Sequence, residues 1–249
     1  MTVLYCLVHS ETPVTAPPGQ GLPGAGPARA VLLDGGLTAI VSTIEMTPDA
    51  VNAKLADVDW VSKAAIGHEA LIESVMQPAA TVLPMKLLTL FSGDARLVKD
   101  LASQRKTLVK AAARVAGCRE YGLRVVAAGP AGAETEPAGR PSSGLAFLER
   151  KKQARDATRD RGARRAAFAR DAFESLAGAA RDAVQRPVAA DEIERPLLDA
   201  AFLVAPENTA AFAEASERLS AEAEEAHCAF RLTGPWPAYH FVQVENAGS

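Results

Sequence analysis

The order of hydrophobic and polar residues in the first half of the chain predicts a sheet. Residues 3–8 are apolar and partly β-branched, which is typical of a buried strand. Two further apolar runs flank Asp34-Gly35-Gly36, and Asp-Gly and Gly-Gly pairs supply the positive φ angles that a tight hairpin turn requires. The pattern therefore predicts a strand followed by a β-hairpin.

Helical spacing follows the hairpin. Thr47 can cap a first helix, because Pro48 is tolerated in a first turn. A second helix carries an apolar stripe at i, i+3 and i+4 spacing, and Pro78 ends it. The stripe consists of Ala64, His68, Leu71, Ile72 and Val75.

Residues 80–91 are strand-like, but Pro84 cannot donate a ladder hydrogen bond and therefore predicts an edge position or a bend. Asp94 can cap the next helix, which Gly117 ends, and residues 121–127 return as a strand. The apolar face of that helix contains Leu97, Leu101, Leu108, Ala112 and Val115. This order of elements predicts an α+β arrangement, with one sheet and helices packed on a face.

A stretch rich in proline and glycine at residues 129–143 predicts a linker between two domains. We predict an N-terminal domain at residues 1–128 and a helix-rich C-terminal α+β domain at residues 144–249. The second domain is predicted to contain a helical region at 145–184 and strands at 197–205 and 229–233. Between these strands we predict a helix that Asn208 caps. The apolar face of this helix contains Phe212, Leu219 and Ala226.

Composition narrows the class of protein. The net charge of −3 implies no general attraction to nucleic acid or to an anionic membrane. Three cysteines are an odd number, and without a CxxC motif they do not form a full disulfide framework. The first residues lack a basic region, and no apolar run approaches about 18 residues, the length of a membrane span. We therefore expect a cytoplasmic protein with reduced thiols.

Motifs for chemistry are weak. Residues 19–24 match GxGxxG, but prolines flank and enter the motif and a hairpin strand follows, which favours a loop over a dinucleotide site. His68-Glu69 lacks the second histidine that a helical zinc site requires, and the other histidines are scattered. Most carboxylates lie beside Lys or Arg at the spacing of solvated helix faces. The sequence predicts no catalytic, cofactor or metal site.

The strongest charge feature is the segment from Glu149 to Arg170. Clustered Lys and Arg can neutralise a nucleic-acid backbone, but three acids interrupt the first part of the segment and aromatic stacking partners are sparse. We favour an exposed helix with ion pairs, or a surface for an acidic protein partner.

A stiff aromatic segment, LTGPWPAYHF, occupies residues 232–241. Pro235 and Pro237 remove two backbone donors around Trp236, so the segment must end a sheet or lie along its edge. A stiffened tryptophan suits both a core and an interface, because stiffness lowers the entropy lost in folding and in binding. The residues alone leave both roles open.

This segment resembles the C-terminal signature of the gas vesicle accessory proteins GvpF and GvpL. Other stretches resemble the same family in the same order: LYCLV, GGLTAIVSTIE, HEALIESVMQPAATVLPMKLLTLF, REYGLRV, GLAFLERKKQAR and AAFLVAPENTAAF. Among them, REYGLRV resembles the strand that closes the first domain of the family. The chain departs from the family at Lys86, Leu87 and Leu88, where an Arg-Phe-Gly run is usual. It also has Ala238 and His240 where proline and serine are frequent.

The resemblance implies an N-terminal ferredoxin-like α/β sandwich and a C-terminal modified ferredoxin-like α+β domain. It implies a non-catalytic, chaperone-like or nucleating accessory protein for gas vesicle assembly, associated with gas vesicles. The implied partners are the very hydrophobic shell protein GvpA and other accessory proteins, with no cofactor, nucleic acid, membrane or small-molecule substrate.

The candidate interface residues come from the two most specific motifs. They are Pro84, Lys86, Gly234, Pro235, Trp236, Pro237, Tyr239 and Phe241. Two alternatives remain open, since a fold does not fix a function. One is a small-molecule-binding or catalytic protein on ferredoxin-like domains, and the other is nucleic-acid binding through Glu149 to Arg170.

Overall fold

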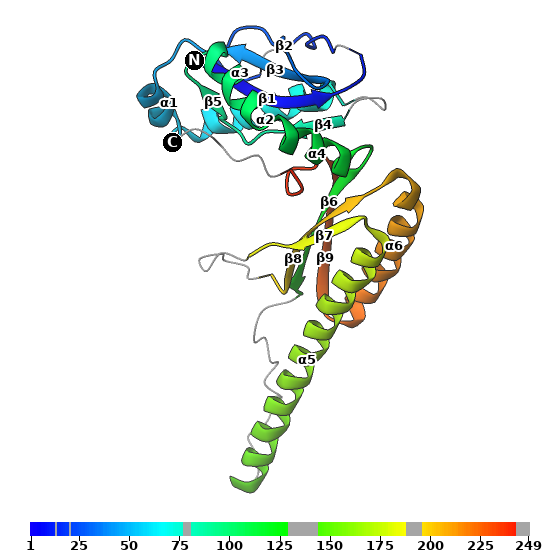
Figure 1. Cartoon of the computed structure of the whole chain (residues 1–249). Helices are drawn as coiled ribbons and strands as arrows, with labels where there is room; N and C mark the ends of the chain where they lie inside the picture. Colours follow the sequence, from blue (N-terminus) through cyan, green and yellow to red (C-terminus); the bar gives the residue numbers. More distant parts are fainter. Residues whose placement is uncertain (13, 20, 77–80, 129–143, 188–195, 243–249) are drawn as a thin grey trace. The chain divides into compact units, whose positions relative to one another are not determined.

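The computed structural model describes residues 1–12, 14–19, 21–76, 81–128, 144–187 and 196–242 (Figure 1). The chain divides into two compact units. Unit 1 comprises Met1–Glu120 and Pro235–Ser249, and unit 2 comprises Tyr121–Gly234. The chain therefore passes twice between the units.

Unit 1 contains an antiparallel sheet in the order β2-β3-β1-β4, with β5 also paired to β1. Its strands are β1 (Thr2–His9), β2 (Arg29–Leu33), β3 (Leu37–Thr43), β4 (Thr81–Pro84) and β5 (Leu90–Phe91). The predicted hairpin is confirmed: Leu33 pairs with Leu37, and Gly35 and Gly36 have φ angles of 82° and 72°. Pro84 ends β4 at the sheet edge, which confirms its predicted position.

The described residues of unit 1 form the helices α1 (Pro48–Lys54), α2 (Val58–Ser74), α3 (Asp94–Ser103) and α4 (Arg105–Val115). Thr47 caps α1 as predicted, since its hydroxyl accepts a hydrogen bond from the Ala50 amide at 3.2 Å. The helix predicted after Asp94 is interrupted at Gln104, so its apolar face is shared between α3 and α4.

Asp94 does not cap α3, contrary to the prediction. Gly93 occupies the cap position, and the Asp94 carboxylate instead accepts a hydrogen bond from the Thr2 hydroxyl at 2.7 Å and pairs with Arg29 at 2.7 Å. The hydrogen bond from Arg29 is the main reason that the pKa of Asp94 lies below its ordinary value. Contacts with two strands thus replace the expected cap.

Unit 2 contains a sheet in the order β7-β8-β6-β9. Its strands are β6 (Arg119–Ala127), β7 (Asp182–Gln185), β8 (Leu198–Val204) and β9 (Cys228–Trp236). The strand expected to close the first domain is β6, but it lies between β8 and β9, and Leu123 and Val125 are buried in the core of unit 2. The units therefore differ from the expected domains at residues 121–128 and 235–249, and the expected linker lies outside the described residues.

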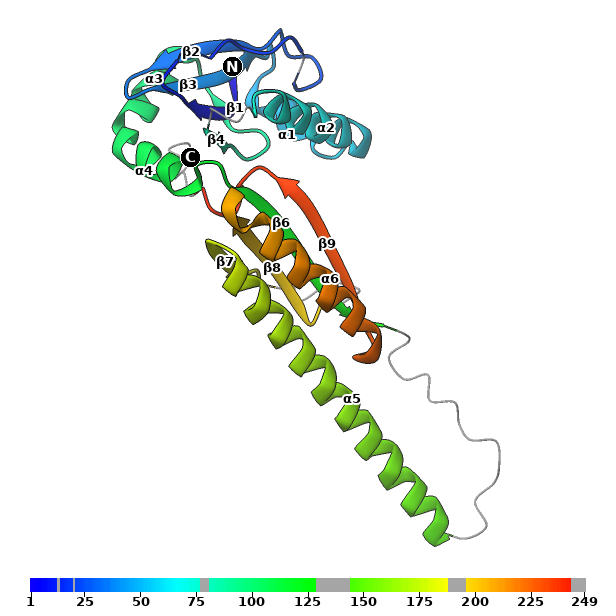
Figure 2. The same cartoon turned by 90° about the vertical axis from the view of Figure 1, so that its right-hand side faces the viewer.

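Helices α5 (Gly144–Ala179) and α6 (Thr209–Glu225) pack on one face of this sheet (Figure 2). A short 3-10 turn, η1 (Pro206–Asn208), precedes α6. Asn208 occupies the cap position of α6, but its side chain makes no capping hydrogen bond. The region predicted as helical to residue 184 ends in β7, where Val184 pairs with Ala201. The α+β fold class with two sheets is confirmed.

Candidate functional site: the C-terminal segment and its anchors

Helix α2 presents two adjacent polar side chains inside unit 1. The imidazole of His68 is 3% exposed, and its Nε2–H donates a hydrogen bond to the Met85 carbonyl at 3.0 Å. Met85 directly follows Pro84, so this bond fixes α2 against the end of β4. Burial lowers the pKa of His68, and the buried Nδ1 has no hydrogen-bond partner among the described residues.

Glu69, the next residue of α2, anchors the C-terminal segment. Its Oε2 atom accepts a hydrogen bond from the Tyr239 hydroxyl at 2.6 Å. Burial raises the pKa of Glu69, and Glu73 adds a smaller raising contribution. Burial, together with the hydrogen bond to Glu69, also raises the pKa of Tyr239, so the phenol remains the donor.

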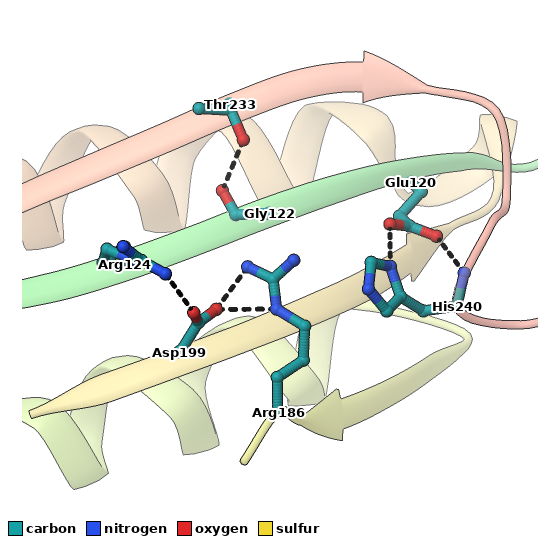
Figure 3. A network of polar contacts seen from close by, with 7 residues as sticks. All are labelled: Glu120, Gly122, Arg124, Arg186, Asp199, Thr233 and His240. Atoms are coloured by element: carbon teal, nitrogen blue, oxygen red, sulfur yellow. Dashed lines mark hydrogen bonds and ion pairs between the residues drawn. The ribbon is translucent and has the colours of Figure 1, made fainter. Parts of the chain in front are cut away.

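A second carboxylate holds the following residue. Glu120 is 4% exposed; its Oε2 accepts the backbone N–H of His240 at 2.8 Å, and its Oε1 contacts His240 Nδ1 at 2.5 Å (Figure 3). Glu69 and Glu120 thus bind consecutive residues of the segment. Two carboxylates from distant parts of the sequence fix its position in unit 1.

Apolar contacts complete the anchoring. Pro237 and three neighbours, Ala238, Phe241 and Val242, are buried, and Tyr239 packs against the core of unit 1. The two motifs that carry the family resemblance therefore meet at α2. His68 reaches the end of β4 and Glu69 reaches the segment after Trp236.

The candidate interface residues fall into two groups. Pro84, Pro237 and Phe241 are buried and Tyr239 is half-buried, so these four stabilise unit 1. Lys86, Gly234, Pro235 and Trp236 are exposed, and Trp236 lies at the end of edge strand β9 with 40% of its surface exposed. Trp236 is thus at the surface rather than in a core.

The departure from the family pattern after Pro84 has a backbone consequence. Leu88 has a φ angle of 63°, a left-handed conformation that glycine adopts without strain. The Arg-Phe-Gly run implied by the family resemblance places glycine at this position. Leu88 compensates by packing its side chain against the core of unit 1.

Sequence reasoning missed a polar network in unit 2. Asp199 of β8 is 8% exposed and accepts hydrogen bonds from Arg124 of β6 at 2.8 Å and from Arg186 Nε at 2.6 Å (Figure 3). On the neighbouring strands, the Thr233 hydroxyl donates to the Gly122 carbonyl at 3.3 Å. A single buried carboxylate between two arginines joins three chain segments, which no local spacing could indicate.

The glycine-rich motif serves packing. A Cβ atom at Gly21 would lie 2.2 Å from the Tyr5 ring, and the Leu22 amide donates a hydrogen bond to the Tyr5 hydroxyl at 3.1 Å. The element that follows is strand β2. Within the described ranges, no cluster of three or more His, Cys, Asp or Glu residues could hold a metal ion. No helix there is long and apolar enough to span a membrane.

The sequence of this chain is similar to those of known proteins. The family model for gas vesicle synthesis protein GvpL/GvpF matches residues 1–243. Gas vesicle protein L from Streptomyces sp. (strain CB03234) is 31% identical over 232 residues, which cover 89% of this chain and 85% of the relative.

Two crystal structures share the fold. GvpF from Anabaena sp. PCC7120 superposes with a TM-score of 0.67 at 17% identity, covering 98% of each chain. GvpF from Microcystis aeruginosa gives a TM-score of 0.65 at 16% identity, covering 98% of this chain and 99% of the other. The chain belongs to the GvpL/GvpF family of gas vesicle synthesis proteins, which is not a known enzyme family and whose role lies in gas vesicle formation.

Proposed function

We propose that this chain is a non-catalytic accessory protein that binds the hydrophobic shell protein GvpA, and other accessory proteins, during gas vesicle assembly. It acts in the cytoplasm at the growing vesicle. Family membership over residues 1–243 supports a role in gas vesicle assembly. The binding surface is supported by one observation on unit 1, an exposed apolar row along α2.

The apolar row consists of Val58 and Ile66 on α2, together with Leu55, the C-cap residue of α1 just before it. Their exposed fractions are 76%, 70% and 50%, in that order. The opposite side of α2 is buried through Trp60, Ala64, His68 and Leu71, so α2 carries large apolar side chains both on its buried face and on its exposed face. Folding of unit 1 accounts for only one of them, and an exposed apolar surface is typical of a binding site.

A shell subunit exposes apolar surface before it joins the vesicle wall, and such surface promotes aggregation. A partner that covers this surface with its own apolar side chains suppresses aggregation without any chemical step. The apolar row supplies such side chains on a rigid helix. Exposed Lys86, Pro235 and Trp236 are further candidates for the contact.

The test compares two double variants for retention of purified GvpA. Val58→Ser/Ile66→Ser should retain at least about tenfold less shell protein than the wild type, because each lost apolar contact contributes about 1 kcal/mol. Leu32→Ser/Val98→Ser removes two exposed apolar side chains elsewhere in unit 1 and should retain the wild-type amount. The proposal fails if wild-type protein retains no shell protein or if both variants behave alike.

Trp236 is tested separately. A Trp236→Ala variant with wild-type melting behaviour and weakened shell-protein retention would make Trp236 a direct contact. Unchanged retention would exclude it from the interface.

A further inference from the structure

The first part of α5 extends beyond the sheet and α6 of unit 2 (Figures 1 and 2). We call residues 144–164 the basic arm. Among the residues of α5 whose burial is described, the first buried one is Phe168, and Arg165 donates hydrogen bonds to the carbonyls of Ala128 at 2.8 Å and His227 at 3.1 Å. Arg165 thus marks the point where the helix reaches the body of unit 2. The arm is about 30 Å long at the rise of an α-helix.

The arm differs in charge from the whole chain. It contains seven basic and three acidic residues, a net charge of +4 in a chain whose net charge is −3. Lys152, Arg155 and Arg159 are exposed and make no hydrogen bond or ion pair with any described residue. Their positive charge is therefore available to a partner.

These cations share a face with apolar side chains. Leu145, Leu148, Lys152, Arg155 and Arg159 follow one another at spacings of three and four residues, so they form one stripe along the helix. Leu145 is 69% exposed and Leu148 is 62% exposed. The stripe is apolar at the tip of the arm and basic toward unit 2.

The chemistry of the stripe selects its partner. A three-four spacing is the pattern by which one helix packs along another. Cations on that pattern attract carboxylates, and the two leucines require apolar side chains opposite them. An acidic amphipathic helix supplies both.

Nucleic acid fits this surface less well. Glu149, Asp156 and Asp160 form an adjacent acidic stripe, which would face the phosphates of a strand lying along the arm. The stripe itself contains no aromatic residue on which a base could stack. Alternating basic and acidic stripes instead favour a partner helix in a defined register.

We propose that the basic arm binds an acidic amphipathic helix of a partner protein. The arm lies in unit 2 and the apolar row proposed for the shell protein lies in unit 1. The arm therefore adds a second binding surface to the proposed function, and its test requires no shell protein.

The test uses full-length protein and a labelled helical peptide of about 20 residues, with leucines and glutamates in the order complementary to the stripe. Fluorescence anisotropy measures the dissociation constant. Lys152→Glu/Arg155→Glu/Arg159→Glu should weaken binding at least about tenfold, because it replaces attraction with repulsion. Lys99→Glu/Lys106→Glu/Lys110→Glu makes the same charge change on exposed residues of α3 and α4 and should leave binding unchanged.

Two further measurements separate the apolar contribution to affinity from the charged one. Leu145→Ser/Leu148→Ser should weaken binding at least about threefold through the lost apolar contact alone. A peptide with glutamine in place of glutamate should bind at least about tenfold more weakly than the acidic peptide. Equal loss in both triple variants, or tighter binding of a single-stranded oligonucleotide than of the acidic peptide at physiological salt, would overturn the proposal. Dimerisation through the arm, seen as concentration-dependent sedimentation that the first triple variant abolishes, would also overturn it.

Discussion

His68 connects the stability of unit 1 to a single proton. Its Nε2 must carry the proton that bonds the Met85 carbonyl, which leaves Nδ1 as the site of further protonation. Nδ1 is buried without a partner in the described part of the chain, and burial holds the pKa below the ordinary value of 6.5. Between the folded pKa and 6.5 the unfolded chain binds more protons than the folded chain. Stability should therefore fall as the pH is lowered through this window.

His68→Gln tests this proton. The glutamine amide can still donate to Met85 but does not titrate. We expect the variant to lose about 1 kcal/mol of stability at neutral pH from imperfect packing and bonding, and to lose less further stability than the wild type on acidification to about pH 5.5. Urea unfolding at several pH values, followed by Trp60 fluorescence in a Trp236→Phe background, measures both effects. An unchanged pH dependence in His68→Gln would refute the assignment.

At the scale of elements, the sequence correctly predicts the features that depend only on neighbouring residues. The hairpin at Gly35-Gly36 and the capping of α1 by Thr47 depend on residues within one turn, and both are confirmed. The edge position of Pro84 depends on one missing donor and is also confirmed. Errors arose where a distant partner competes with a local preference. Asp94 has the chemistry of a cap, but Arg29 and Thr2 bind it instead.

In the candidate site, the contacts between residues distant in sequence were even harder to predict. The aromatic and proline signature marked residues 234–241, but no spacing indicated which of its side chains would be buried. Glu69 and Glu120 had no local signal, because their partners Tyr239 and His240 lie more than a hundred residues away in sequence. Family resemblance found the motifs, and the structure was needed to join them through α2.

Gly162 is the weak point of α5. It lies in the middle of an exposed helix, and a Cβ atom there would have nothing within 4 Å. Alanine is favoured over glycine in a helix interior by up to about 1 kcal/mol, so Gly162→Ala should stabilise the basic arm. Amide hydrogen exchange in residues flanking position 162 should slow by roughly threefold to fivefold.

Gly36→Ala provides the contrasting change. The φ angle of 72° and a Cβ position 3.1 Å from the Ser10 carbonyl oxygen make alanine strained at that site. This variant should destabilise unit 1, whereas Gly162→Ala should not. Faster exchange in Gly162→Ala would show that the glycine serves the arm in another way, such as a bend required by a partner.

At the scale of the whole molecule, unit 1 is built from two distant pieces of chain. Residues 235–242 contribute the buried side chains of Pro237, Ala238, Phe241 and Val242, and the bonds to Glu69 and Glu120. Loss of a buried phenylalanine alone commonly costs about 3–5 kcal/mol, and an ordinary domain has about 5–15 kcal/mol in total. Unit 1 should therefore be marginal or unfolded without this segment.

Truncation after Gly234 tests that dependence, and the tryptophans make it easy to read. The chain has two, and truncation removes Trp236, which leaves buried Trp60 as a reporter of unit 1 alone. Full-length Trp236→Phe is the matched reference. We expect the truncated protein to lose the cooperative Trp60 transition or to show it at least about 10 °C lower, while much of the far-ultraviolet helical signal from α5 and α6 persists. An unchanged Trp60 transition would assign residues 235–242 to the second domain, as the boundary at 144–249 requires.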